Sequence, residues 1–110
     1  MVLFRRLLGD VLRSARMQRG MTLRELSAEA RVSLGYISEI ERGQKEASSE
    51  LLASICRALD LPLSQMLSDV ADRLTLAEAA ETQMAAVLHE GLARPLRHVR
   101  SRRDQVVSAA

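Results

Sequence analysis

The feature that most constrains this sequence is a pair of short predicted helices between residues 22 and 43, separated by a very short break. Thr22-Leu23-Arg24-Glu25 is a capping box, in which the Thr22 hydroxyl and the Glu25 carboxylate each accept a hydrogen bond from an otherwise free backbone N–H. It predicts a helix over about 23–30. Ser33 caps a second helix, which ends at Arg42-Gly43. Because only Arg31-Val32 separates them, the two helices must pack against each other at an angle.

The rest of the chain predicts an all-α fold. Phe4 and Tyr36 are the only aromatic residues, Gly and Pro are scarce, and no alternating β-branched run occurs. Apolar residues at helical spacing predict further helices over about 7–19, 49–59, 62–74 and 75–88. The inward-facing positions that we expect are Leu8, Val11, Leu12, Ala15, Leu26, Ala30, Ile37, Ile40, Leu51, Leu52, Ile55, Cys56, Leu59, Leu63, Met66, Leu67, Val70 and Leu74.

Three segments follow from this pattern. Residues 1–74 form a compact domain, residues 75–92 a further helix opened by a second capping box (Thr75 to Glu78), and residues 93–110 a basic flexible tail. The helix in 75–92 carries an apolar stripe made of Leu76, Ala80, Met84, Val87 and Leu88. We prefer dimerisation through this helix and the preceding one, and packing of the stripe on the preceding helix of the same chain is the alternative.

Charge and composition narrow the function. The first 31 residues hold seven arginines and three acidic residues, whereas residues 60–91 are strongly acidic, and this asymmetry indicates a polyanionic partner at one surface. A single cysteine excludes a disulfide within the chain, and His89 and His98 lack partners at metal-ligand spacing. No segment is long and apolar enough for a membrane span, so we expect a cytoplasmic protein. No nucleophile–base set, paired carboxylates or Gly-rich phosphate loop indicates an enzyme, and no cofactor is expected.

The two central helices form a helix-turn-helix arrangement. In it, the first helix braces across the phosphate backbone and the second enters the major groove of double-stranded DNA by its N-terminal end. Small residues there allow close approach, and the outward side chains one turn later reach base edges. The predicted base-contacting residues are Ser33, Leu34, Gly35, Ser38 and Glu39. For Glu39, a solvated acid that makes no contact is an equally weighted alternative.

Polar groups around these helices suit the phosphate backbone, which provides affinity and register rather than sequence information. The predicted phosphate-contacting residues are Thr22, Arg24, Tyr36, Arg42, Gln44 and Lys45. The tail arginines at 94, 97, 100, 102 and 103 would add nonspecific attraction to DNA, although a solubilising tail is the favoured interpretation.

The stretch VSLGYISEIERGQKEASSELLASICRALDLP resembles the core of the XRE/Cro-type helix-turn-helix domain, and the resemblance covers about residues 7–70. It implies a five-helix, lambda-repressor-like DNA-binding bundle with a C-terminal helical dimerisation extension. It also implies a structural ion pair between Arg16 and Glu41. The sequence departs from the family pattern in two places. Many members carry glutamines where Leu34 and Gly35 stand, and the turn often has glycine where Arg31 stands. At positive φ, Arg31 would be strained.

More narrowly, LLGDVLRSAR and SLGYISEIERGQKEASSELL resemble the actinobacterial regulators of Clp protease genes. That resemblance implies a dimeric activator of Clp protease and stress genes, bound to a pseudo-palindromic operator in the nucleoid. RNA polymerase is then a candidate partner. A Clp protease is another, through a C-terminal degradation tag that includes Ala109 and Ala110.

A protein-interaction adaptor or antitoxin-like module with the same fold remains an alternative function. Leu34, Gly35 and Glu39 are its only support. DNA binding with a steep salt dependence would separate a regulator from an adaptor.

Overall fold

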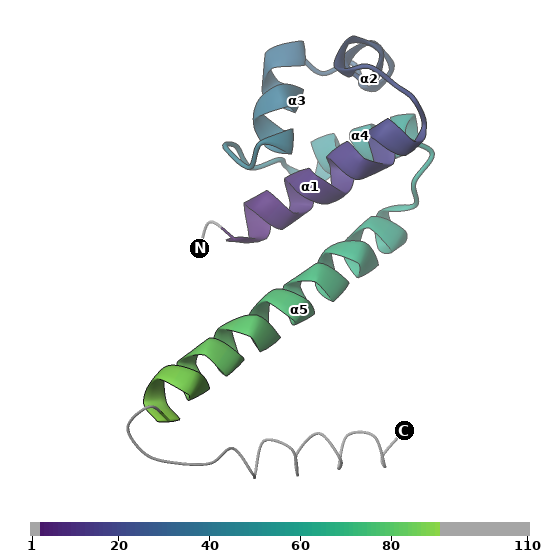
Figure 1. Cartoon of the computed structure of the whole chain (residues 1–110). Helices are drawn as coiled ribbons and strands as arrows, with labels where there is room; N and C mark the ends of the chain where they lie inside the picture. The colour runs from purple at the N-terminus through teal and green to yellow at the C-terminus, as the bar shows by residue number, and fades with distance from the viewer. Residues whose placement is uncertain (1–2, 91–110) are drawn as a thin grey trace. The chain divides into compact units, whose positions relative to one another are not determined.

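A computed structural model describes residues 3–90, which form five α-helices and no strand (Figure 1). The helices are α1 (Leu3–Gln18), α2 (Leu23–Ala30), α3 (Leu34–Glu41), α4 (Ser49–Ala58) and α5 (Leu63–Glu90). The predicted all-α class is confirmed. The chain divides into two compact units, of which the first ends at Thr75 and the second begins at Leu76.

Side-chain caps begin the three inner helices, two of them at the predicted residues Thr22 and Ser33. The Thr22 hydroxyl accepts from the Glu25 N–H at 3.0 Å, and the Glu25 carboxylate accepts from the Thr22 N–H at 2.8 Å, which completes the capping box. Ser33 caps α3 by accepting from the Tyr36 N–H, and Ser48 caps α4 by accepting from the Leu51 N–H. Each cap satisfies a backbone donor that the helix leaves free.

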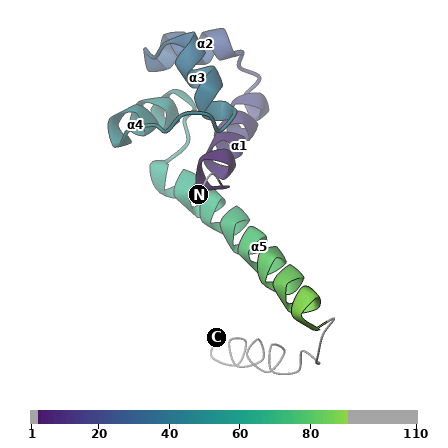
Figure 2. The ribbon, with the colours of Figure 1, turned by 90° about the vertical axis from the view of Figure 1, so that its left-hand side faces the viewer.

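The first unit is a bundle in which α2 and α3 lie together at one end (Figure 1 and Figure 2). α1 packs on α3, and α2 packs on both α3 and α4. The core is aliphatic, as predicted, and consists of Leu8, Val11, Leu12, Leu26, Ala30, Val32, Ile37, Ile40, Ile55, Cys56, Leu59, Met66 and Val70. Burial raises the pKa of the Cys56 thiol, which therefore stays protonated and packs as a small apolar group.

Gly9 explains how closely α1 approaches α3. A Cβ atom at this position would lie 2.4 Å from the carbonyl oxygen of Ile40 and 2.5 Å from that of Glu41. Both atoms belong to backbone and cannot move aside without displacing α3. The absent side chain thus sets the distance between the two helices.

An ion pair also joins these two helices. The Arg16 Nε donates to Glu41 Oε2 at 2.8 Å and its Nη2 donates to Oε1 at 3.0 Å, so the two groups meet as a bidentate fork. The third guanidinium nitrogen, Nη1, donates to the Met21 carbonyl at 2.8 Å. The side chains are only 12% and 5% exposed. The hydrogen bond to Glu41 raises the pKa of Arg16, which holds the guanidinium in its charged form.

Two predictions about the last helices are wrong. The sequence predicts a helix break at Thr75, but α5 continues from Leu63 to Glu90. The Thr75 hydroxyl donates to the Ala71 carbonyl one turn earlier, at 2.9 Å, and so does not cap a new helix. No Gly or Pro interrupts the chain near Thr75, whereas Gly20, with φ +67, ends α1 before the capping box at Thr22.

The second error concerns the inward face of α5. Leu63 and Leu67 are 39% and 47% exposed, although the sequence predicts that they are buried. Met66 and Val70, one turn apart, are the residues of α5 that enter the core. α5 therefore carries more apolar residues than the core of the first unit buries.

The Arg16–Glu41 pair makes a stability prediction. Replacing Arg16 by Ala leaves the Glu41 carboxylate buried without its partner, and we expect the free energy of unfolding to fall by about 3–5 kcal/mol. Denaturant titration measures this change. As a matched control, Arg19→Ala removes an exposed pair with Asp60 at 3.6 Å and should cost less than about 1 kcal/mol. Equal losses for the two variants would contradict the assigned role of the buried pair.

Candidate nucleic-acid interface

The N-terminal end of α3 is small and open to solvent. Ser33 forms the cap, and Leu34 and Gly35 are the first two residues of the helix. All three are exposed, Leu34 by 38%. A Cβ atom built on Gly35 would meet nothing within 4 Å, so no contact inside the chain requires glycine here. This end of the helix leaves room for another molecule to approach the backbone.

The turn before α3 holds that end in place. Arg31 has φ 60 and ψ 45, a left-handed conformation that strains a residue with a side chain. The carbonyl of Ser27 accepts from the N–H groups of Arg31 and Val32, and the Ser27 hydroxyl donates to the Val32 carbonyl at 2.5 Å. Val32 is buried. These contacts stabilise a turn for which the arginine side chain is poorly suited.

The predicted base-contacting residues one turn further on are Ser38 and Glu39, which are half-buried on the side of α3 away from Ile37 and Ile40. Ser38 is not isolated, because its hydroxyl oxygen accepts from Nη1 of Arg42. Nη2 of the same guanidinium donates to the Gln44 side-chain oxygen at 3.3 Å. The sequence predicts separate roles for these three residues. Their spacing of four and two residues was the signal that they could touch.

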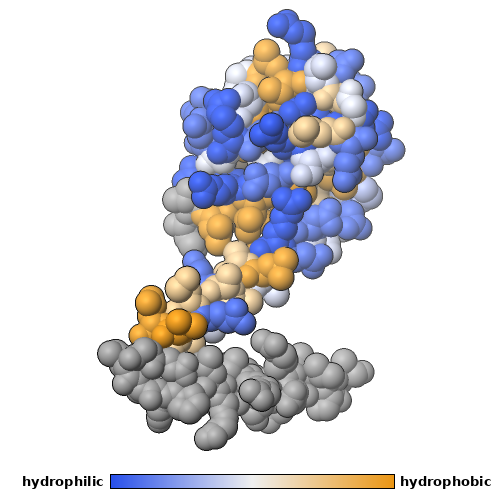
Figure 3. Space-filling view, in the orientation of Figure 1, coloured by the Kyte–Doolittle hydropathy of each residue, from blue (hydrophilic) through white to orange (hydrophobic). Residues whose placement is uncertain are grey.

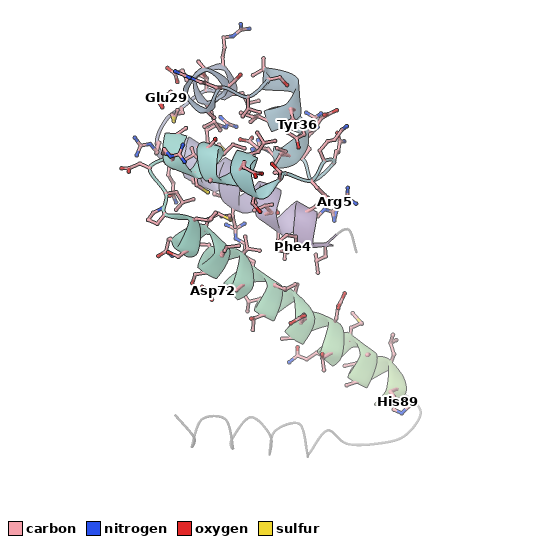
Figure 4. All side chains as sticks on the ribbon, turned by 180° about the vertical axis from the view of Figure 1, so that it is seen from behind. Phe4, Arg5, Glu29, Tyr36, Asp72 and His89 are labelled. Carbon is pink, nitrogen blue, oxygen red and sulfur yellow. The ribbon has the colours of Figure 1, made fainter. Side chains whose placement is uncertain are left out.

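Tyr36 contributes to the structure of the loop after α3. Its phenol donates to the Glu46 carbonyl at 2.6 Å, and Arg5 of α1 lies 3.8 Å from the Glu46 carboxylate. Figure 4 shows Tyr36 and Arg5 on the same side of the first unit. Because a phosphate can only accept hydrogen bonds, a Tyr36–phosphate contact would require the phenol to exchange its partner. That contact stays a prediction.

The other predicted phosphate-contacting residues lie on exposed surface near both ends of the two helices. Thr22 and Arg24 are at the N-terminus of α2, while Gln44 and Lys45 follow the C-terminus of α3. The helix N-termini add partial positive charge, which suits an anionic backbone. The predicted phosphate-contacting residues thus fall into two groups. Thr22 and Arg24 lie at the N-terminus of α2, and Arg42, Gln44 and Lys45 follow the C-terminus of α3.

The second unit contains the predicted dimerisation stripe. Leu76, Met84, Val87 and Leu88 are 72%, 60%, 57% and 68% exposed, and Ala80 is exposed as well. Spacings of three and four residues place them on one face of α5. Figure 3 shows hydrophobic residues gathered at the surface near the C-terminal end of this helix. Side chains of this size are rarely left open in such a group without a partner.

The tail over 93–110, with its arginines, His98 and the degradation tag at Ala109 and Ala110, lies outside the described residues. Within residues 3–90, no group of three His, Cys, Asp or Glu residues lies close enough to hold a metal ion. Among the described helices, none has both the length and the apolar composition that crossing a bilayer requires.

A shallow depression of about 410 Å³ lies between α2 and α4. Its charged lining residues are Glu29, Arg31 and Arg57. Arg31 and Arg57 sit at the C-terminal ends of α2 and α4, where a cation offsets the partial negative charge of a helix end. This balance explains the two arginines without a bound ligand.

Comparison with known sequences identifies relatives among transcription factors. The family model HTH_3, described as helix-turn-helix, matches residues 12–66. Transcriptional regulator ClgR of Mycobacterium tuberculosis is 63% identical over 76 residues, which are 69% of this chain and 68% of ClgR. HTH-type transcriptional regulator DdrOP3 of Deinococcus deserti is 32% identical over 82 residues, 74% of this chain and 58% of DdrOP3.

Two solved structures resemble this chain in fold. The crystal structure of the clp gene regulator ClgR from Corynebacterium glutamicum superposes with a TM-score of 0.69 at 49% identity, over 82% of this chain and 94% of that one. The restriction-modification controller protein C.AhdI from Aeromonas hydrophila, at 24% identity and a TM-score of 0.55, covers 56% of this chain and 94% of its own. The second comparison shows a common fold only.

Gly35 provides a test that separates folding from binding. Gly35→Ala places a methyl group in open space inside a helix, so we expect the free energy of unfolding to rise by up to about 1 kcal/mol. The same methyl group should obstruct close approach of a duplex and weaken DNA binding, as measured by fluorescence anisotropy. The control is Gly9→Ala, which should destabilise the fold by at least about 2 kcal/mol. Unchanged DNA affinity in Gly35→Ala would contradict the assignment of this helix end to the interface.

Proposed function

The chain belongs to the XRE-type helix-turn-helix family of transcriptional regulators, among the relatives of ClgR, and we propose that it binds a pseudo-palindromic operator as a homodimer and activates Clp protease and stress genes. The observation that carries the proposal is the open end of α3 at Ser33, Leu34 and Gly35. This end is capped by Ser33 and is unobstructed at Gly35, while α1 holds the opposite end of α3 through Glu41.

In this proposal, α3 enters the major groove with its N-terminal end. The Leu34 side chain contacts a thymine methyl group, and Gly35 lets the backbone come close to base edges. Ser38 and Glu39 reach bases one turn further along. Glu39 accepts from a cytosine amino group, and its charge lowers affinity for the neighbouring phosphates while it adds discrimination.

Phosphate contacts come from both sides of α3. Thr22 and Arg24 lie at the positive end of α2 and meet one strand, while Arg42, Gln44 and Lys45 meet the backbone after the helix. Tyr36 reaches a phosphate only by giving up its bond to the Glu46 carbonyl, so its larger contribution is to hold the loop that carries Gln44 and Lys45.

Dimerisation supplies affinity and spacing. The exposed stripe at Leu76, Ala80, Met84, Val87 and Leu88 buries its apolar surface against the same stripe of a second copy, because a two-fold interface is self-complementary. Two copies of α3 about 34 Å apart then read two half-sites on one face of the duplex.

The regulatory role is proposed from the relatives. A solved relative is described as the clp gene regulator, and the proposal assigns similar targets to this chain. Activation requires contact with RNA polymerase, which we propose as a partner at the bound promoter. The site of action is then the nucleoid in the cytoplasm.

The experiment that tests DNA recognition is selection of bound sequences from random duplexes, followed by affinity measurements at several salt concentrations. We expect two inverted half-sites whose centres are about 10 base pairs apart. Binding through six or more phosphates should weaken by about a thousandfold or more between 50 and 200 mM salt. If no sequence is enriched and binding is independent of salt, the chain is an adaptor that has lost DNA readout.

The dimer interface is tested by placing a charge on the stripe. Met84→Glu buries a carboxylate in the proposed interface, so we expect monomers by multi-angle light scattering and a large loss of operator affinity. Thr82→Glu is the matched control, because Thr82 is exposed on the same helix but lies away from the stripe. Dimers that persist in Met84→Glu would place the interface elsewhere.

A further inference from the structure

Ser38, Arg42 and Gln44 form a hydrogen-bonded row beside the C-terminal end of α3. Arg42 is at its centre, with Nη1 donating to the Ser38 hydroxyl oxygen and Nη2 donating to the Gln44 side-chain oxygen. Arg42 and Gln44 are exposed, and Ser38 is half-buried. The row therefore lies at the surface, next to residues expected to meet DNA.

The direction of these hydrogen bonds is fixed by chemistry. A guanidinium has five N–H donors and no acceptor, so Ser38 can only accept from Arg42. The Ser38 hydroxyl proton must then point away from Arg42. In a helix, a serine proton often bonds to the carbonyl four residues earlier, as the Thr75 hydroxyl does with Ala71. None of the hydrogen bonds within residues 3–90 uses the Ser38 proton in this way, which leaves it available to a molecule outside.

We propose that Arg42 is a positioning residue that makes Ser38 a hydrogen-bond donor towards DNA, and that this pair selects a base with an acceptor in the major groove. Free serine hydroxyls are ambiguous readers, because they can donate or accept. With its oxygen engaged by Arg42, Ser38 favours thymine O4, guanine O6 or N7, or adenine N7. It disfavours cytosine, whose major-groove edge offers an amino group alone. This inference rests on the proposed function.

Gln44 contributes by holding the guanidinium in place. Arg42 is a long and exposed side chain, and a single hydrogen bond would restrict it little. Its bond to Gln44 fixes a second nitrogen, so the planar group is directed along the row. Positioning of Ser38 is additional to two other roles that Arg42 can have. Arg42 follows the last residue of α3, where a cation offsets the helix dipole, and a guanidinium there also suits a phosphate.

The experiment compares base preference in the full chain, its Ser38→Ala and Arg42→Ala variants, and the double variant. The probes are the operator selected by the wild-type chain and its single-base substitutions, in competition binding. Lys45→Ala is the matched control, because Lys45 is also an exposed cation after α3 but has no hydrogen bond to Ser38. Circular dichroism and thermal melting verify that each variant is folded.

We expect Ser38→Ala and Arg42→Ala to lose discrimination at the same base pair, by about fivefold to tenfold, with no further loss in the double variant. Lys45→Ala should weaken all operators equally, keep the base preference and reduce the salt slope by about one.

Three results would overturn the inference. Arg42→Ala could behave like Lys45→Ala, which would make Arg42 a phosphate contact or a helix-end charge alone. Ser38→Ala could lose a preference for cytosine, which would mean that the Ser38 hydroxyl accepts a hydrogen bond from the base. Ser38→Ala could leave every base preference intact. These results differ from failure of the proposed function, in which the wild-type chain itself would select no sequence.

Discussion

The buried fork between Arg16 and Glu41 is the interaction on which the remainder of this structure depends. One guanidinium bonds to both oxygens of a carboxylate on α3 and to the Met21 carbonyl in the turn before α2. It thereby ties together α1, the entry to the helix-turn-helix and the C-terminal part of α3. A buried carboxylate without this partner would be costly, so the pair fixes which face of α3 turns inward. Gly9 allows the close approach of α1 to α3 that the pair needs.

The consequence for the proposed interface is a shape that is set before any duplex binds. α3 is fixed on its inner side by Ile37, Ile40 and Glu41 and at its start by Ser33. The bond from Tyr36 to the Glu46 carbonyl holds the loop that follows it. Ordering these groups in advance reduces the entropy lost on binding. The left-handed Arg31 is a local exception, since its backbone conformation disfavours most residues other than glycine.

Much of this could be predicted from sequence because short-range rules apply where a helix begins. Thr22, Ser33 and Ser48 are caps in the structure, and each follows a turn or loop in which the preceding helix has already ended. Thr75 and Glu78 are the same residue types at the same spacing as Thr22 and Glu25, yet Thr75 does not cap a helix. The residues around Thr75 are good helix formers, so the helix continues through them. A capping box predicts a helix start only when the chain before it has already left the helix.

The remaining errors and omissions have a different cause. Leu63 and Leu67 fit an apolar stripe, but burial depends on which part of that stripe other helices cover, and spacing does not show this. The bonds of Arg42 to Ser38 and of Tyr36 to Glu46 depend on rotamers and on the path of a loop, which sequence does not specify. The side-chain contacts of the proposed interface are therefore harder to predict than the helices that carry them.

The central claim is that the open end of α3 is the surface that meets DNA. An NMR titration of the labelled full chain with its selected operator tests this most directly, residue by residue. The account predicts that the largest changes in amide chemical shift fall on residues 33–39, with smaller changes at the N-terminus of α2 and in the loop after α3. Shifts confined to α4 or to the second unit, with residues 33–39 unaffected, would contradict it.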